Sequence, residues 1–133
     1  MNHHSAPRPR LDGVRILLVE DEADLLDALA EHLRSVGASV VTASSLKAAR
    51  AALVDAQFDL LISDIGLPDG SGHDVATEAR GAGRVRAAMA LTGNRGEAAV
   101  DASRAAGFQM HLTKPCDPAT LVRVAQLLLA REA

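Results

Sequence analysis

The fold is decided by the stretch Asp59-Leu60-Leu61-Ile62-Ser63-Asp64-Ile65-Gly66-Leu67-Pro68-Asp69-Gly70. Its apolar residues lead into a carboxylate at Asp64 and then directly into the turn residues Pro68 and Gly70. A short apolar run bounded by proline and glycine predicts a buried strand, of the kind found at the centre of a parallel sheet. Asp64 is then expected at the carboxyl end of that strand, where open α/β sheets place their ligand sites.

Four further apolar runs flank this stretch and alternate with helical patterns. We predict strands over 14–19, 38–42, 59–63, 87–91 and 109–113, and helices that begin near residues 24, 45, 73, 97 and 117. Gly37 and Gly107 stand where a glycine is expected to end a helix. Because right-handed crossovers connect successive parallel strands, the alternation predicts an α/β domain with a five-stranded, doubly wound parallel sheet and helices on both faces.

Three of the predicted helices have a clear apolar face with helical spacing. Ser44 or Ser45 is expected to cap the second helix, and Asp117 the last. The residues expected to face the core are Leu26, Leu29, Ala30 and Leu33 in the first helix, Leu46, Ala49 and Leu53 in the second, and Leu121, Val124, Ala125 and Leu128 in the last.

Length and composition restrict the class of protein. A chain of 133 residues is one domain, which we place at 13–133 after a flexible tail at 1–12. Aromatic residues make up only 2%, the net charge is −3, and there is no extended basic cluster, so direct nucleic-acid binding is not expected. The sequence shows no signal peptide and no apolar run long enough to insert into a membrane, so we predict a cytoplasmic domain.

Polar side chains follow four of the five predicted strands. Glu20 and Asp21 follow the first, Asp64 the third, Thr92 the fourth and Lys114 the fifth. The carboxyl ends of parallel strands lie along one edge of a sheet, so these five side chains are expected in one cleft.

The expected cleft has the groups that phosphoryl transfer needs. Clustered carboxylates repel one another, and a divalent cation such as Mg²⁺ relieves this repulsion and also recruits phosphate oxygens. A lysine supplies a positive charge for phosphate and a hydroxyl supplies a hydrogen bond. Asp64 is therefore predicted to be a nucleophile that forms an aspartyl phosphate.

Four motifs in order make the chain resemble a response-regulator receiver domain over nearly all of residues 14–131. They are Ile-Leu-Leu-Val-Glu-Asp-Glu at 16–22, Ser-Asp-Ile-Gly-Leu-Pro-Asp-Gly-Ser-Gly at 63–72, Ala-Leu-Thr-Gly at 90–93 and Leu-Thr-Lys-Pro at 112–115. The resemblance implies a flavodoxin-like fold with strand order 2-1-3-4-5. The forms of the second and third motifs look most like receivers attached to hybrid histidine kinases.

The resemblance also implies a role for each strand-end residue. Asp64 matches the phosphoacceptor, which receives the phosphoryl group from a phosphohistidine. Asp21 and Asp64 match direct ligands of Mg²⁺ or Mn²⁺, the carbonyl of Gly66 matches a third, and Glu20 matches an acid that holds the metal through water. Thr92 matches the switch hydroxyl and Lys114 the phosphate-binding lysine.

Three positions depart from the family pattern, and one of them bears on the switch. His111 stands where an inward-swinging Tyr or Phe is usual, and a histidine can titrate near neutral pH. We treat His111 as a candidate switch residue beside the simpler interpretation of a packed histidine. Gly66 lacks a side chain over the phosphoacceptor, and Cys116 replaces a bulkier residue. Pro115 follows Lys114, often through a cis bond in the family.

The resemblance implies partners as well. These are a histidine kinase or a histidine phosphotransfer protein and a downstream effector that the sequence does not identify. Receivers often pair as homodimers, and whether this chain does so stays open. A stand-alone regulator, a phosphorelay intermediate and a receiver from a larger protein all remain open. The expected domain assists its own phosphorylation and turns over no external substrate.

Two other functions compete with this one. The first is a phosphatase with an aspartate nucleophile, but such enzymes usually carry a second Asp two residues after the first, where this chain has Gly66. The second is a degenerate receiver that acts only as an interaction module. The complete set of acids together with Thr92 and Lys114 argues against it.

Overall fold

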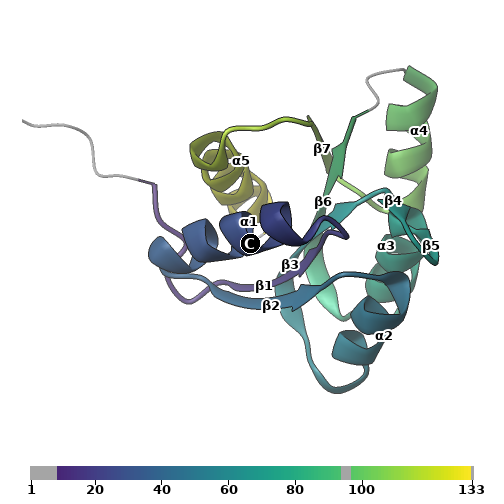
Figure 1. Ribbon diagram of the computed structural model, residues 1–133, viewed down its shortest axis with the longest axis horizontal. Coiled ribbons are helices and arrows are strands. Elements are labelled where there is room, and N and C mark those ends of the chain that lie inside the picture. The colour runs from purple at the N-terminus through teal and green to yellow at the C-terminus, as the bar shows by residue number, and fades with distance from the viewer. Residues whose placement is uncertain (1–8, 94–96, 133) are drawn as a thin grey trace, which may run out of the picture.

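The computed structural model describes residues 9–93 and 97–132. Within these residues, no helix is both long and apolar enough to cross a lipid bilayer. The elements, labelled in Figure 1, are β1 (Arg15–Val19), α1 (Ala23–Ser35), β2 (Ser39–Ala43), α2 (Leu46–Asp55), β3 (Phe58–Asp64), β4 (Gly66–Leu67), β5 (Gly70–Ser71), α3 (Gly72–Gly81), β6 (Val85–Thr92), α4 (Glu97–Ala106), β7 (Met110–Thr113) and α5 (Pro118–Arg131).

Five of the strands form one parallel sheet in the order β2-β1-β3-β6-β7. These are the five predicted strands, and their order confirms the flavodoxin-like arrangement implied by the resemblance. The remaining two strands were not predicted as strands. β4 and β5 pair antiparallel as a small hairpin directly after β3, within the loop where the sequence predicts turn residues at Pro68 and Gly70.

Helices cover both faces of the sheet, as a doubly wound fold requires (Figure 1). One core cluster packs α1 and α5 against one face, with Ile16, Leu60 and Met89 among its fully buried members. The other packs α2 and α3 against the opposite face, around Leu17, Leu61 and Phe58. The central strand β3 supplies buried residues to both clusters because successive side chains of a strand point to opposite faces.

The predicted helix faces are buried in α1 and α2, residue for residue. In α5 the prediction is wrong at one position. Leu121, Ala125 and Leu128 are buried as expected, but the fourth buried residue is Val122, and Val124 is only partly buried. The reason is that α5 packs against α1 as well as against the sheet, so its buried face is rotated from the simple periodic one.

Helix ends follow the predicted local chemistry. The Ser45 hydroxyl accepts the Ala48 N–H at 3.0 Å, and the Asp117 carboxylate accepts the Ala119 N–H at 3.0 Å. Gly37 and Gly107 have φ angles of 101° and 110°, in the left-handed region that favours glycine. These caps set where α1, α2, α4 and α5 begin or end.

The predicted tail at 1–12 is too long at its C-terminal end. Residues 1–8 lie outside the described residues, but Leu11 is 2% exposed and donates its N–H to the Val36 carbonyl at 2.8 Å. The Gln126 side chain also donates to the Arg10 carbonyl at 2.7 Å. The segment around Leu11 therefore packs between α1 and α5, because Leu11 is an apolar residue that the core can bury.

Candidate functional site

The register of the sheet aligns the carboxyl ends of its central strands. Val19 lies opposite Ser63, Asp64 opposite Leu91, and Thr92 opposite Thr113. Asp64 and Thr92 are themselves the last residues of β3 and β6. The other residues predicted to converge directly follow β1 and β7 in the chain. The structure thus brings Glu20, Asp21, Asp64, Thr92 and Lys114 to one edge of the sheet.

The three acids form a compact cluster. Ligand oxygens of Glu20, Asp21 and Asp64 all lie within 4.8 Å of one another. Glu20 is buried, with 1% of its surface exposed, whereas Asp64 is partly buried and Asp21 is exposed. Oxygen atoms of carboxylates at such separations are the ligands that Mg²⁺ or Mn²⁺ prefers, and exposure on the Asp21 side leaves room for the waters that Mg²⁺ retains.

Lys114 bridges two of these acids. Its Nζ donates to Glu20 Oε1 at 2.5 Å and to Asp64 Oδ2 at 3.0 Å. Burial lowers the pKa of Lys114, but the hydrogen bonds and charges of Glu20 and Asp64 outweigh it, so the pKa lies above its usual value. The amine is therefore a fixed cation at neutral pH, within reach of any phosphate group near Asp64.

Glu20 is held from two sides. Besides the contact with Lys114, its Oε2 accepts the Glu22 N–H at 3.0 Å. Burial raises the pKa of Glu20, and the nearby negative charge of Asp64 adds to this, while the hydrogen bonds from Lys114 and Glu22 oppose it. A carboxylate whose charge is disfavoured in this way gains from a nearby cation.

The backbone around Asp64 is held tightly by its neighbours. The Ser63 hydroxyl donates to the Asp64 carbonyl at 2.8 Å, and the Gly72 N–H donates to the Ile65 carbonyl at 2.7 Å. A β carbon on Gly72 would overlap the Asp64 carbonyl oxygen. Only glycine therefore fits where α3 begins, a role the sequence analysis did not assign to it.

Gly66 and Thr92 occupy the places the sequence predicts. Gly66 is exposed in β4, and its N–H donates to Asp64 Oδ1 at 3.3 Å; the use of its carbonyl as a metal ligand stays a prediction. Thr92 is 7% exposed at the end of β6, and its carbonyl accepts the Lys114 N–H at 2.7 Å. The Lys114–Pro115 peptide bond is cis, as the resemblance implied.

His111 lies on β7, away from the acids. It is paired with Ala90 and lines a hollow of about 280 Å³ together with Val100, Ser103 and Phe108. Its Nε2 is buried and has no hydrogen-bond partner among residues 9–93 and 97–132. Burial lowers the pKa of His111, and repulsion from His73 on α3 lowers it further. A switch role for His111 stays a prediction.

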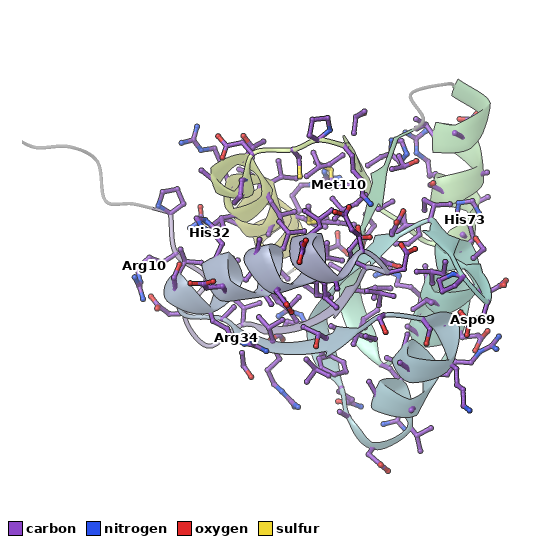
Figure 2. The ribbon with its side chains drawn as sticks, in the orientation of Figure 1. Arg10, His32, Arg34, Asp69, His73 and Met110 are labelled. Carbon is purple, nitrogen blue, oxygen red and sulfur yellow. The ribbon has the colours of Figure 1, made fainter. Side chains whose placement is uncertain are left out.

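Asp69 caps the start of α2, a role that the sequence does not reveal. Its two carboxylate oxygens accept the N–H groups of Leu46 and Lys47 at 2.7 and 2.9 Å. Figure 2 shows Asp69 beside the start of α2. The loop that follows Asp64 is thereby tied to a helix 23 residues earlier in the chain, and no local pattern could have revealed that contact.

Comparison with protein families gives a match along most of the chain. The response regulator receiver domain family matches residues 16–126. An uncharacterized 14.6 kDa protein of Leptolyngbya boryana is 35% identical over 113 residues, which cover 84% of this chain and 86% of that protein. Response regulator protein PmrA of Pseudomonas aeruginosa is 39% identical over 104 residues, which cover 78% of this chain and 47% of PmrA.

Several curated relatives are much longer than the matched region. The chain covers less than half of PmrA and 23% of the Pseudomonas aeruginosa transcriptional regulatory protein AlgB.

Solved structures share the fold. A CheY-like receiver domain protein of Methanospirillum hungatei superposes with a TM-score of 0.82 at 26% identity, covering 90% of this chain and 95% of that one. Chemotaxis response regulator CheY4 of Vibrio cholerae superposes with a TM-score of 0.80, also at 26% identity, covering 86% and 97%.

Proposed function

This chain belongs to the response regulator receiver domain family, and on that basis we propose that Asp64 accepts a phosphoryl group from a phosphohistidine. The observation that carries the proposal is the contact of one Asp64 oxygen with Lys114 Nζ at 3.0 Å, inside the cluster with Glu20 and Asp21. No other acid among the described residues lies in such a cluster.

The proposed transfer needs little from Asp64 beyond its position. A carboxylate oxygen attacks phosphorus, the new P–O bond forms and the P–N bond to the donor imidazole breaks. Because the carboxylate has no proton to lose, no general base is required. Lys114 balances the negative charge of the phosphoryl oxygens, and its place between Glu20 and Asp64 holds it there before the donor arrives.

The acidic cluster fits a divalent cation. Glu20, Asp21 and Asp64 would hold Mg²⁺ or Mn²⁺ together with the Gly66 carbonyl, as the close approach of three carboxylates and the raised pKa of Glu20 support. The bound ion would supply charge neutralisation for the transferring group.

In the proposed signalling step, phosphorylation of Asp64 changes the position of Thr92. In the proposal, Thr92 moves its hydroxyl to the phosphoryl oxygens, and because its backbone is bonded to Lys114, β6 and β7 respond together. His111 has an adjacent hollow into which its ring can turn, beside α4. The face of α4, β7 and α5 would then change for a partner.

Partners are proposed from the family. A histidine kinase or a histidine phosphotransfer protein supplies the phosphoryl group, and an effector reads the switched face. Receiver domains are generally not enzymes, and we propose that this one acts only on its own Asp64 in the cytoplasm.

Phosphorylation can be tested without the cognate kinase. The chain is incubated with Mg²⁺ and acetyl phosphate and its intact mass is measured, in parallel with Asp64→Asn and with Asp27→Asn, which removes an exposed acid on α1. We expect one phosphate adduct in the wild type and in Asp27→Asn, and none in Asp64→Asn.

Three outcomes would contradict the proposal. An adduct that persists in Asp64→Asn would place the phosphoryl group on another residue. Absence of any adduct in the wild type, with both acetyl phosphate and phosphoramidate as donors, would leave a receiver that acts without phosphorylation. Steady release of phosphate from unrelated phosphate monoesters would instead indicate the phosphatase.

A further inference from the structure

A second hollow lies at the other end of the sheet from Asp64. It has a volume of about 210 Å³ and is formed at the amino ends of β1, β3 and β6. In Figure 1 this is where the loop from α2 enters β3 at the bottom of the molecule. The residues that line it include Arg15, Phe58, Asp59, Arg84 and Arg86, and we call this hollow the arginine pocket.

The arginine pocket is positively charged in a chain whose net charge is −3. Three arginines line it, and Asp59 is the single acid among its lining residues. Both oxygens of Asp59 are occupied: one accepts from Arg86 Nη1 at 3.2 Å and the other from the Arg15 backbone N–H at 2.8 Å. Two positive charges therefore remain unbalanced around the hollow.

Two of the guanidinium groups have free donors. The Arg84 side chain has no hydrogen-bond or ion-pair partner within residues 9–93 and 97–132. The Arg15 guanidinium lies over the Phe58 ring, with 5.5 Å between its central carbon and the ring centroid. A cation–π contact with the ring uses none of the N–H donors of the guanidinium, and no hydrogen bond of the Arg15 guanidinium is found within residues 9–93 and 97–132.

The backbone that carries these arginines is rigid. The Arg84 N–H donates to the Ala79 carbonyl at 2.8 Å, and the Arg84 carbonyl accepts the Phe58 N–H at 2.8 Å. The Arg86 carbonyl accepts from Arg80 Nη1 at 2.6 Å. These bonds hold the main chain beside the hollow in place, so that binding an anion there costs little ordering of the main chain.

From this arrangement we propose that the arginine pocket binds a diphosphate group, either free or carried by a nucleoside. Guanidinium forks bind phosphate oxygens in pairs, so Arg15 and Arg84 can each take one phosphate. A hollow of about 210 Å³ is small, which favours a compact anion. Arg86 keeps its ion pair with Asp59 and contributes positive charge beside the bound anion.

The test uses ¹H–¹⁵N spectra of the full chain, titrated with sodium pyrophosphate and separately with ADP. EDTA is present throughout, so that neither compound is recruited by a metal at the acidic cluster. We expect saturable shifts of the amide signals of residues 15, 57–59 and 83–86. Saturation with ADP alone would indicate a diphosphate carried by a nucleoside, and similar dissociation constants for both compounds would indicate the diphosphate itself.

Substitutions assign the binding to the free guanidinium groups. Arg84→Gln and Arg15→Gln are each expected to weaken binding about tenfold or more, because each removes a charge-assisted hydrogen bond. Arg123→Gln, on the exposed side of α5, should bind as the wild type does. The Arg84 side chain has no described partner to lose, so Arg84→Gln should keep the wild-type spectrum without ligand.

Three results would overturn the proposal. The first is the absence of saturable shifts with either compound at millimolar concentration. The second is a set of shifts confined to residues near Glu20, Asp64 and Lys114, which would place the anion at the phosphoryl site. The third is equal weakening by Arg123→Gln and Arg84→Gln, which would indicate unspecific attraction of anions.

Discussion

Gly72 packs against the main chain of Asp64 so closely that a β carbon on Gly72 would overlap the Asp64 carbonyl oxygen. Asp64 ends β3, and Gly72 begins α3 after the β4–β5 hairpin. The Ser63 hydroxyl also donates to that same carbonyl at 2.8 Å. The position of the proposed phosphoacceptor therefore depends on a missing side chain eight residues later in the chain.

Gly72→Ala should destabilise the domain and slow its phosphorylation. The overlap with backbone cannot be relieved by a rotamer change, so we expect a loss of about 2–3 kcal/mol in the free energy of unfolding. Gly81→Ala is the matched control, because a β carbon at the end of α3 meets no atom and alanine favours helix by up to about 1 kcal/mol. Urea denaturation measures the free energy of unfolding of the two variants. Equal stability of Gly72→Ala and Gly81→Ala would contradict the predicted overlap.

Lys114→Met should lower the free energy of unfolding of the domain as well as its phosphorylation. Removing the amine leaves buried Glu20 and partly buried Asp64 without their cation, and breaking such a pair from one side costs about 3 kcal/mol. Lys47→Met removes an exposed lysine on α2 and should change stability by less than about 0.5 kcal/mol. Urea denaturation in EDTA compares them. A Lys114→Met variant as stable as Lys47→Met would argue against the ion pairs.

Mg²⁺ should raise the melting temperature through the acidic cluster. An ion that binds only the folded state adds about 2.7 kcal/mol when its concentration is a hundred times its Kd. Asp21→Asn removes one of the three clustered carboxylates and should reduce the shift strongly, whereas Asp27→Asn on the exposed side of α1 should keep it. Thermal melts in Mg²⁺ and in EDTA measure this, and an unchanged shift in Asp21→Asn would place the ion elsewhere.

His111 should make stability fall as the pH falls below about 6.5, the ordinary pKa of histidine. Burial, followed by repulsion from His73, lowers the pKa of His111 in the folded state. The unfolded chain then takes up a proton before the folded one does, so stability is lost between the ordinary pKa and the lowered one. The loss is about 1.4 kcal/mol for each pKa unit between them.

His111→Phe removes the titrating group, so that comparison with the wild type isolates the contribution of His111 to the pH dependence of stability. Urea denaturation of the wild type and of His111→Phe at pH 7.5 and pH 5.5 should show a larger loss in the wild type. NMR titration of the His111 ring gives the folded-state pKa directly. An identical pH dependence in both proteins would show that His111 titrates as it does in water.

Much of the site could be predicted because its residues follow local signals. Each strand is an apolar run, and the polar residue directly after it must lie at the carboxyl edge of a parallel sheet. Asp64, Lys114 and Thr92 are found at that edge by this rule alone. The caps at Ser45 and Asp117 are equally local, since each side chain bonds a backbone N–H two or three residues away.

Only the tertiary structure decided which residues distant in the sequence are in contact. Lys114 pairs with both Glu20 and Asp64, Asp69 caps α2, and Gly72 meets the main chain of Asp64.

The burial of Leu11 and Val122 and the gathering of three arginines at the far end of the sheet belong to the same class. The physical reason is that periodicity in the sequence determines which element forms and which face it buries. The partners of a side chain depend instead on register and packing between elements, which no stretch of the chain contains by itself.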